Sequence, residues 1–307
     1  MSTLRAALRE AIEQLTAAQV PSASLAAELL LLHVLDRDRT FLYAHPQAEL
    51  SLDQQRAYRH LLGRRSAGTP TQYLTGRQEF WGLPFTVAPG VFIPRPETEH
   101  VVEVVLAIVR ERLMEPGARI VDVGTGTGCI ALALASELPL AEIFATDISD
   151  GALALAGANA EALGLIGRVQ FLRSDLLEVL VGNPGARSLP AQAGTLHDAR
   201  FDVIVSNPPY ISPDDASQLP REVLEHEPAA ALFSPDEGLA VTRRLIEQAS
   251  QLLAPSGYLA LELGYQMSGR VKSLLGEGWT NVEVTPDLRG IPRVLSAQRI
   301  GATDGHG

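Results

Sequence analysis

Cysteine is almost absent from this chain, because Cys129 is the only one among 307 residues. A single cysteine excludes a framework of intramolecular disulfides and is typical of a reducing compartment. Long apolar runs are missing as well, and none approaches the roughly 18 residues that a membrane span needs. Residues 1–10 also lack the apolar stretch and cleavage site of a signal peptide. We therefore expect a cytoplasmic protein with no membrane partner.

Positive charge is scarce, since the net charge is −11 and Lys272 is the only lysine. Residues 1–75 hold 8 Arg and 7 Asp or Glu, so the rest of the chain carries a net charge of −12. Tight, non-specific binding to a polyanion needs clustered Lys and Arg against the phosphates. The charge balance therefore argues against a stable nucleic-acid partner, although it does not exclude a local basic groove.

Apolar residues at helical spacing dominate the first part of the chain, as Leu4, Leu8 and Ile12 illustrate. This spacing predicts a small all-α bundle over residues 1–75, which we interpret as a substrate-docking domain. Residues 76–97 instead alternate aromatic and β-branched residues with Gly and Pro, which predicts a β-hairpin and a linker. The overall content of 46% hydrophobic and 20% charged residues is that of a soluble globular protein.

Strands and helices alternate in the rest of the chain, residues 98–300. The expected strands are 119–123, 142–146, 169–172, 201–206 and 258–263, followed by two further strand-like runs at 281–285 and 294–299. This alternation predicts an α/β domain in which helices cover both faces of a parallel sheet. Residues 182–200 are rich in Gly, Pro and Ala and are interpreted as a mobile insertion, whereas residues 301–307 are expected to form a frayed tail.

Three glycines directly follow the first strand of this α/β region. Gly124, Gly126 and Gly128 stand in the sequence VDVGTGTGCIALALA, between a strand and a helix. Glycine lets the backbone approach a ligand closely, and a helix start presents free N–H groups. The dinucleotide-binding fingerprint needs a glycine at its sixth position, and that position is Cys129 here, so the fingerprint is absent. No lysine follows the glycines, which excludes a P-loop. Cys129 is expected to be a small core residue, with a lowered pKa at the helix start as the alternative.

Carboxylates end the next two strands. Asp147 lies about twenty residues past the glycines, where an acidic side chain can accept both hydroxyls of a ribose. Asp175 can accept an adenine amino proton while the Leu176 backbone N–H meets a ring nitrogen. Because ligands bind at the carboxyl ends of parallel strands, we predict a nucleoside-type cofactor here. The competing interpretation is ordinary loop glycines and solvated aspartates.

The fourth strand ends in an unusual corner within IVSNPPYI, formed by Asn207, Pro208, Pro209 and Tyr210. Prolines cannot donate to a sheet ladder, so a rigid turn is one explanation. The corner, however, lies at the ligand edge of a strand that adjoins the cofactor strand. Its position therefore favours a role in binding.

A planar amide or aromatic amine would suit this corner. Such a nitrogen is a poor nucleophile because its lone pair is delocalised, and it carries two N–H donors. Asn207 Oδ1 and the Pro208 carbonyl can accept from both donors, while Tyr210 stacks on the flat group. The glycine loop resembles the methionine-donor binding loop of S-adenosylmethionine-dependent methyltransferases with the Rossmann-like fold. Beside such a donor, the corner would hold a planar NH2 group in line with the sulfonium methyl. No base would be needed before the transfer, because the extra proton becomes acidic once the nitrogen is methylated.

Three segments together closely resemble the release-factor glutamine methyltransferase family of the HemK/PrmC type. They are PTQYLTGRQEFWGLPFTVAPGVFIPRPETEHVVE (Pro70–Glu103), VDVGTGTGCIALALA and IVSNPPYI, and the resemblance extends from about Leu4 to Arg299. It implies a Rossmann-like, class I S-adenosylmethionine-dependent methyltransferase domain with a small all-α N-terminal domain and a connecting β-hairpin. It also implies methylation of the side-chain nitrogen, N5, of the glutamine in the Gly-Gly-Gln motif of class I peptide release factors. S-adenosylhomocysteine would be the second product, and the modification would support translation termination.

The resemblance also implies roles for individual residues. It places the donor on Gly124, Thr125, Gly126, Thr127, Gly128, Asp147, Leu176 and Asn207. It places the substrate glutamine on Asn207–Tyr210, with Phe92, Arg95, Pro96 and Glu97 lining the pocket wall. A purely structural hairpin is the alternative for that wall. Some members of the family carry an aromatic residue directly after the aspartate that ends the third strand, whereas this chain has Leu176 at that position.

Other activities compete with this prediction. A sister family methylates a glutamine of a ribosomal protein, but the segment Arg95–Glu99 follows the release-factor form. The same corner could also serve an exocyclic amine of adenine or guanine in RNA or DNA, and a cofactor-binding module without turnover is a third possibility. A metal site is not expected, because the histidines are scattered and cysteine is single. His226 and Glu227, in LEHEP, are candidates to border the pocket.

Overall fold

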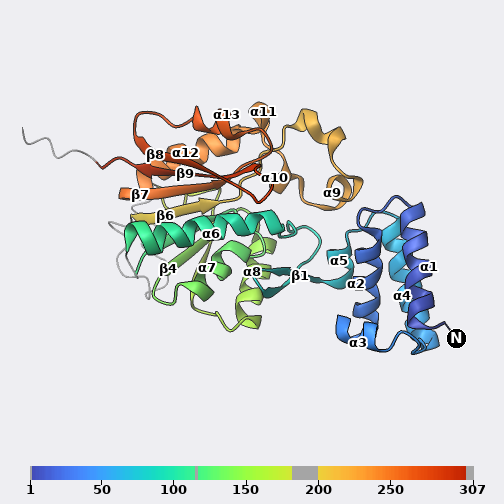
Figure 1. Cartoon of the computed structure of the whole chain (residues 1–307). Coiled ribbons are helices and arrows are strands. Elements are labelled where there is room, and N and C mark those ends of the chain that lie inside the picture. The colour runs from blue at the N-terminus through green and yellow to red at the C-terminus, as the bar shows by residue number, and fades with distance from the viewer. Residues whose placement is uncertain (1, 115–116, 182–199, 302–307) are drawn as a thin grey trace, which may run out of the picture. The chain divides into compact units, whose positions relative to one another are not determined.

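The computed structural model describes residues 2–114, 117–181 and 200–301, which form two compact units (Figure 1). The helical unit comprises Met1–Arg77, Val87–Pro89 and Leu219–Glu227, and the sheet unit comprises Gln78–Thr86, Gly90–Gln218 and Pro228–Gly307. Residues 182–199 of the predicted insertion and residues 302–307 of the predicted tail lie outside the described residues. No helix within the described ranges is long and apolar enough to cross a membrane.

The helical unit consists of short helices around a leucine-rich core. Its elements are α1 (Leu4–Ala17), α2 (Ala23–Leu35), α3 (Arg39–Ala44), α4 (Leu52–Ser66), α5 (Thr71–Thr75) and α9 (Arg221–His226). Leu4, Leu15 and Leu30 are fully buried, as the helical spacing requires. Ser51 and Gln54 form a capping box at the start of α4, which satisfies two backbone N–H groups. The predicted all-α character of this region is confirmed.

Helix α9 joins the helical unit from far along the sequence. Arg65, at the end of α4, is 4% exposed and pairs with Glu222 of α9. Arg65 also donates to the Thr69 carbonyl at 3.3 Å, but its Nε has no partner among the described residues. A buried guanidinium is costly without a counter-charge, so this pair fastens α9 to the unit. The sequence analysis did not assign residues 219–227 to this region.

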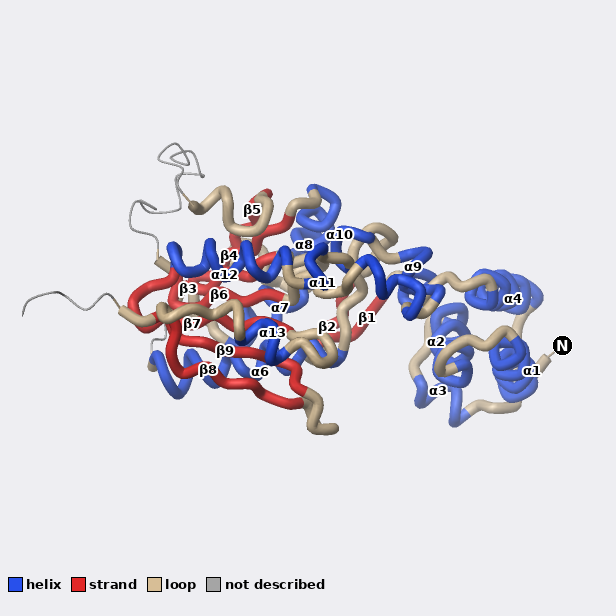
Figure 2. The backbone as a smooth tube through the Cα atoms, turned by 90° about the horizontal axis from the view of Figure 1, so that it is seen from above, coloured by secondary structure: helices blue, strands red, loops and turns tan. Residues whose placement is uncertain are grey.

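The sheet unit contains a two-stranded and a seven-stranded sheet. The strands are β1 (Arg77–Phe80), β2 (Leu83–Thr86), β3 (Arg119–Val123), β4 (Glu142–Asp147), β5 (Val169–Arg173), β6 (Phe201–Ser206), β7 (Leu253–Glu262), β8 (Trp279–Pro286) and β9 (Pro292–Arg299). In the large sheet the order is β5-β4-β3-β6-β7-β9-β8, and Figure 2 shows these strands side by side. Within the large sheet, β9 runs opposite to the other six strands. The predicted strands and the largely parallel α/β sheet are confirmed, although β7 begins earlier than expected.

Helices cover both faces of this sheet. They are α6 (Glu99–Ala107), which continues as a π-helix (Ile108–Leu113), α7 (Cys129–Glu137) and α8 (Asp150–Ala162) on one face, and α12 (Ala240–Leu252) and α13 (Ser268–Lys272) on the other (Figure 1). Short segments complete the unit: 3-10 turns at Pro96–Thr98 and Pro213–Gln218, and helices α10 (Ala229–Leu232) and α11 (Pro235–Gly238). Successive strand residues point to opposite faces, so Ile120 joins one core and Val121 the other. Near-continuous apolar strands follow from this double coverage.

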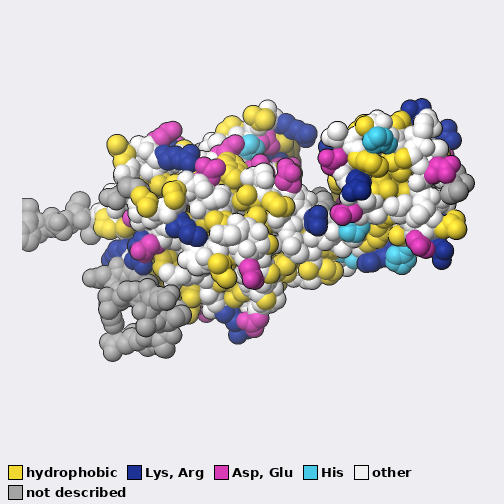
Figure 3. Space-filling model, turned by 90° about the horizontal axis from the view of Figure 1, so that it is seen from below, with side chains coloured by type: hydrophobic (Ala, Val, Ile, Leu, Met, Phe, Trp, Pro, Cys, Tyr) yellow, Lys and Arg dark blue, Asp and Glu magenta, His cyan; other side chains and the backbone are white. Residues whose placement is uncertain are grey.

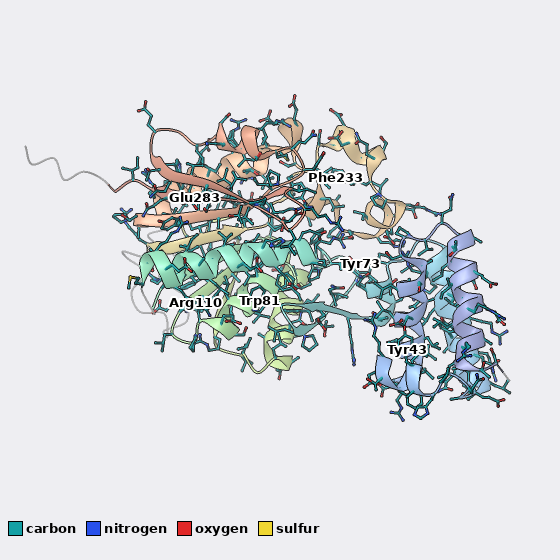
Figure 4. The ribbon with its side chains drawn as sticks, in the orientation of Figure 1. Tyr43, Tyr73, Trp81, Arg110, Phe233 and Glu283 are labelled. Carbon is teal, nitrogen blue, oxygen red and sulfur yellow. The ribbon has the colours of Figure 1, made fainter. Side chains whose placement is uncertain are left out.

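The β1–β2 hairpin is attached to the sheet unit by polar contacts. Trp81 Nε1 and Arg110 Nη2 donate to the two carboxylate oxygens of Glu137, at 3.1 and 2.8 Å (Figure 4). Both bonds lower the pKa of Glu137, with the larger effect from Arg110. Asn159 of α8 binds Thr86 in both directions and also donates to the Thr127 carbonyl at 3.0 Å. One buried amide thus links the hairpin to the glycine loop.

Loss of the Arg65 partner should weaken the helical unit selectively. We expect Glu222→Ala to lower the free energy of unfolding by about 2–3 kcal/mol, because it leaves the buried Arg65 charge unpaired. Urea denaturation and limited proteolysis within residues 219–227 would measure the effect. The matched control is Glu225→Ala, which removes an exposed partner of Arg221 on the same helix and should change little. Equal behaviour of the two variants would contradict the role given to Arg65.

Candidate active site

The glycine loop lies at the carboxyl end of β3 and is held by backbone hydrogen bonds. Gly124, Gly126 and Gly128 all have positive φ, between 57° and 84°, which explains the requirement for glycine. The N–H groups of Gly124 and Thr125 both donate to the Thr146 carbonyl of β4, at 2.8 and 2.9 Å. A Cβ on Gly124 would meet no atom within 4 Å, whereas one on Gly128 would lie 3.1 Å from Ala156. The loop is therefore open at its first glycine and closely packed at its third.

Two aspartates shape this loop from different sides. Asp147 accepts from the N–H groups of Gly126 and Ser149, both at 2.9 Å. Each carboxylate oxygen of Asp147 keeps a further lone pair, so the predicted ribose contact is compatible with these bonds. Asp122 is fully buried and accepts from the Thr125 hydroxyl at 2.6 Å and the Ala131 N–H at 3.2 Å. Burial raises the pKa of Asp122 to about 7.

Asp175 and Leu176 lie beyond β5, on the same side of the sheet unit as Asp147. Asp175 Oδ2 accepts from Arg244 of α12 at 2.8 Å, which leaves its other oxygen for a further donor. Leu176 has a φ of +51°, and Leu177 donates its N–H to Gln248 at 2.8 Å. The turn is thus tied to α12 by two polar contacts. Its proposed contacts with adenine stay a prediction.

The Asn207–Tyr210 corner begins where β6 ends, one strand away from the glycine loop. Ser206 is directly opposite Val123 in the parallel pairing of β3 and β6, and its hydroxyl donates to the Val123 carbonyl at 2.7 Å. Asn207 Nδ2 donates to the Thr98 hydroxyl at 3.2 Å, and Pro208 is buried. Beyond the corner, Ile211 exchanges backbone hydrogen bonds with Leu232 and Ser234 at 3.0 and 2.9 Å. The corner is therefore fixed on both sides.

Tyr210 lies against two glycines that the sequence analysis did not single out. A Cβ on Gly264 would come within 2.7 Å of Tyr210 Cδ2, and one on Gly238 would collide with the Tyr210 carbonyl. Only hydrogen at these positions leaves room for the Tyr210 ring and backbone. Burial also raises the pKa of the Tyr210 phenol, so the ring stays neutral. Gly264 lies two residues after the end of β7, in LELGY, and this position was the only signal in the sequence.

Thr98 and Glu262 are the other residues that the sequence analysis missed. Thr98 is 2% exposed and Glu262, the last residue of β7, is 4% exposed. The Thr98 hydroxyl accepts a hydrogen bond from Asn207 Nδ2 at 3.2 Å. Burial raises the pKa of Glu262 to about 7, while Thr98 opposes this shift. A buried carboxylate beside the corner had no visible signature in the sequence.

The predicted wall residues precede α6. Phe92 and Arg95 are half-buried, with the Arg95 guanidinium 4.7 Å from the centre of the Phe92 ring. Pro96 and Glu97 are exposed in the turn before Thr98. The turn lies near the corner, because Thr98 at its end accepts a hydrogen bond from Asn207. Their contact with a substrate stays a prediction.

Cys129 is buried at the start of α7 as a small core residue. Burial raises its pKa to about 12, so the alternative of a lowered pKa is wrong. His226 and Glu227 belong to the helical unit, at the end of the segment that contains α9. Among the described residues, no group of three or more His, Cys, Asp or Glu could hold a metal ion.

Two family models match the chain over separate regions. The model described as PrmC N-terminal domain matches residues 6–76, and the model described as Methyltransferase domain matches residues 114–275. The catalytic domain of hMettl16, solved in complex with the MAT2A 3'UTR hairpin 6, is 19% identical with a TM-score of 0.54. The match covers 80% of this chain and 83% of the hMettl16 chain. At 19% identity, it shows only that the two chains share a fold.

Curated relatives match the chain almost from end to end. A release factor glutamine methyltransferase of Koribacter versatilis (strain Ellin345) is 43% identical over 97% of this chain and 99% of its own length. A protein of the same name from Escherichia coli (strain K12) is 41% identical over 94% of this chain and 95% of its own. Together with the sheet order of a class I methyltransferase, these matches show that the chain belongs to the release factor glutamine methyltransferase family.

Proposed function

We propose that this protein methylates N5 of the glutamine in the Gly-Gly-Gln motif of class I peptide release factors, with S-adenosylmethionine as the methyl donor. The observation that carries the proposal is the Asn207–Tyr210 corner, held beside the open glycine loop by the pairing of β6 with β3. The near full-length similarity to release factor glutamine methyltransferases supports the choice of acceptor.

The residues at the ends of β3, β4 and β5 fit a nucleoside-type donor. Gly124 offers open backbone, Asp147 keeps acceptor capacity on both oxygens, and Asp175 keeps one oxygen beside Leu176. We propose that the loop Gly124–Gly128 takes the methionine part, Asp147 the ribose hydroxyls, and Asp175 with Leu176 the adenine. When bound, this donor supplies an electrophilic methyl group on a positively charged sulfur.

The corner would hold the acceptor by its two N–H groups. We propose that Asn207 Oδ1 accepts one N–H and the Pro208 carbonyl accepts the other, which leaves the nitrogen lone pair directed at the methyl group. Two prolines keep these dipoles fixed, so little reorganisation is needed in the transition state. The neutral Tyr210 ring would stack on the flat amide. The nitrogen loses its proton to solvent after methylation, so no residue has to act as a base beforehand.

The surrounding parts would supply specificity for a protein substrate. We propose that Phe92, Arg95, Pro96 and Glu97 line the approach to the corner and that the helical unit docks the release factor. The match of residues 6–76 to the PrmC N-terminal domain supports a dedicated role for the helical unit. In the view of Figure 3, basic side chains are scattered among acidic ones, and the net charge of −11 does not favour a nucleic-acid substrate.

Mass spectrometry would test the acceptor directly. Purified enzyme and donor would be incubated with a class I release factor, a ribosomal fraction or tRNA, and each digest searched for a mass gain of one methyl group. We expect the gain on the glutamine of the Gly-Gly-Gln peptide, because the corner fits an amide NH2. A release factor that stays unmodified while ribosomal protein or tRNA gains a methyl group would overturn the proposal.

Removal of the Asn207 amide should abolish turnover without abolishing donor binding. We expect Asn207→Ala to lower kcat by about 100-fold or more, since one preorganised acceptor is lost. Isothermal calorimetry with the donor should still detect binding, because the glycine loop and Asp147 are intact. Asn281→Ala, on the exposed face of β8, is the matched control and should leave both measurements unchanged. Near-normal turnover of Asn207→Ala would refute the role of the amide.

A methyl group on Gly264 should displace the Tyr210 ring. We expect Gly264→Ala to lower kcat/KM by about tenfold or more, because a new Cβ would lie 2.7 Å from the ring. The matched control is Gly269→Ala in α13, where a Cβ meets no atom within 4 Å. Donor affinity should stay the same in both variants. If the two substitutions have equal effects on kcat/KM, Tyr210 does not depend on Gly264.

A further inference from the structure

We propose that Asn159 couples the glycine loop to the β1–β2 hairpin, so that binding of the donor stabilises the hairpin and the wall segment that follows it. Asn159 is a positioning residue in this proposal and touches neither the donor nor the acceptor. The inference rests on the proposed function, which assigns the loop Gly124–Gly128 to the donor. It goes beyond that function because the donor site and the acceptor site become thermodynamically linked.

Three segments of the sheet unit meet at the Asn159 side chain, which lies on α8 and is 1% exposed. Its Nδ2 group donates to the Thr127 carbonyl in the glycine loop at 3.0 Å and to the Thr86 carbonyl at the end of β2 at 3.1 Å. Its Oδ1 accepts from the Thr86 N–H at 2.8 Å. One amide therefore binds the glycine loop and the hairpin at the same time.

The orientation of the Asn159 amide is fixed by the chemistry of its partners. A backbone carbonyl can only accept and a backbone N–H can only donate, so Nδ2 faces the two carbonyls and Oδ1 faces the Thr86 N–H. A flipped amide would set donor against donor and acceptor against acceptor. Asn159 thus pairs with Thr86 through one donor and one acceptor, as a neighbouring strand would. Because the side chain is buried, water cannot easily replace these bonds.

The same face of α8 packs against the end of the glycine loop. Ala156 is fully buried and lies three residues before Asn159, a spacing that places both on one side of the helix. A Cβ on Gly128 would lie only 3.1 Å from the Ala156 Cβ, so the loop and the helix are in close contact. The Thr127 carbonyl, directly before Gly128, consequently keeps a fixed place relative to the Asn159 amide.

A second contact joins the glycine loop to the segment beyond the hairpin. A Cβ on Gly126 would meet Val91 Cγ1 at 4.0 Å, so the side-chain direction of Gly126 faces Val91. Val91 is 6% exposed and directly precedes Phe92, the first residue proposed for the acceptor wall. The loop is therefore bound to the hairpin through Asn159 and packed against the start of the wall through Val91.

These contacts predict that the donor and the hairpin stabilise each other. A donor bound on Gly124–Gly128 would restrain the loop, and the Thr127 carbonyl would then hold Asn159 in the orientation that also satisfies Thr86. An acceptor would meet a wall that is already ordered, so it would lose less conformational entropy on binding. By linkage, the acceptor must raise the affinity for the donor by the same factor.

Asn159→Asp removes the N–H donors at almost constant side-chain volume. The carbonyls of Thr86 and Thr127 would then face acceptor oxygens. We expect the Kd for S-adenosylhomocysteine, measured by isothermal calorimetry, to rise by about tenfold or more. Asn281→Asp is the matched control, because it changes an exposed amide on β8, and it should keep the wild-type Kd. A wild-type Kd in Asn159→Asp would overturn the proposal.

A second control separates Asn159 from a general loosening of the hairpin. Glu137→Ala removes the partner of Trp81, which attaches the hairpin to α7 rather than to the glycine loop. We expect this variant to lower the thermal unfolding temperature while the Kd for S-adenosylhomocysteine stays unchanged. An equal rise in Kd in Glu137→Ala and Asn159→Asp would mean that any loosening of the hairpin weakens the donor, and would overturn the specific role of Asn159.

A measurement on the wild type keeps the inference testable if Asn159→Asp does not fold. Hydrogen exchange of the backbone amides would be followed by NMR with and without S-adenosylhomocysteine. We expect the Thr86 N–H to exchange about tenfold more slowly with the ligand, because its acceptor on Asn159 is held more firmly. The amides of β8 should not change and report any general stabilisation. Equal slowing in β8, or no slowing at Thr86, would contradict the coupling.

The link to the acceptor is measured separately. With a class I release factor present, the wild type should bind S-adenosylhomocysteine about fivefold or more tightly. This gain should disappear in Asn159→Asp and persist in Asn281→Asp. A gain that persists in Asn159→Asp would overturn the coupling. A release factor that is neither bound nor methylated, while Thr86 exchange still responds to the ligand, would overturn the proposed function and still support the link between the loop and the hairpin.

Discussion

The parallel pairing of β3 with β6 is the contact on which the site depends. It places Val123 opposite Ser206, so the two segments that leave these strands, the glycine loop and the Asn207–Tyr210 corner, emerge side by side. The Ser206 hydroxyl reinforces the junction through the Val123 carbonyl. A slip of the register would separate the proposed donor site from the proposed acceptor site. Chemistry between two bound molecules thus depends on backbone hydrogen bonds deep in the sheet.

Rigidity around the corner comes from several kinds of restraint acting on different atoms. The two prolines fix the backbone of the corner. Gly238 and Gly264 pack closely against Tyr210 and restrict its position. The hydrogen bond to Thr98 holds the Asn207 amide. None of these restraints is itself a large source of stability. Their combined effect is that the polar groups are already arranged before a substrate arrives, which is how enzymes limit the reorganisation needed in the transition state.

Sequence reasoning singled out the parts of the candidate site that lie close together along the chain, and their roles stay a prediction. The glycine loop, Asp147 and the Asn207–Tyr210 corner follow recognisable strands, and the strands themselves were clear from their apolar runs. Thr98, Gly238 and Gly264 escaped notice because each contacts a corner residue that lies tens of positions away in the sequence. Their roles depend on the order of the strands, which puts β7 next to β6, and no local pattern encodes that neighbourhood. The same reason applies to α9, whose partner Arg65 lies in α4.

The assignment of residues 219–227 to the helical unit has a consequence for how the protein can be divided. The chain enters that unit three times, so it is not an appendage that can be shed by trimming the first residues. A protein that started at residue 78 would retain α9 without the helices it packs on, with the Glu222 carboxylate unpaired. Any inherited or engineered exchange of the helical unit would therefore have to bring all three stretches of sequence with it, one of them only a few residues beyond the corner.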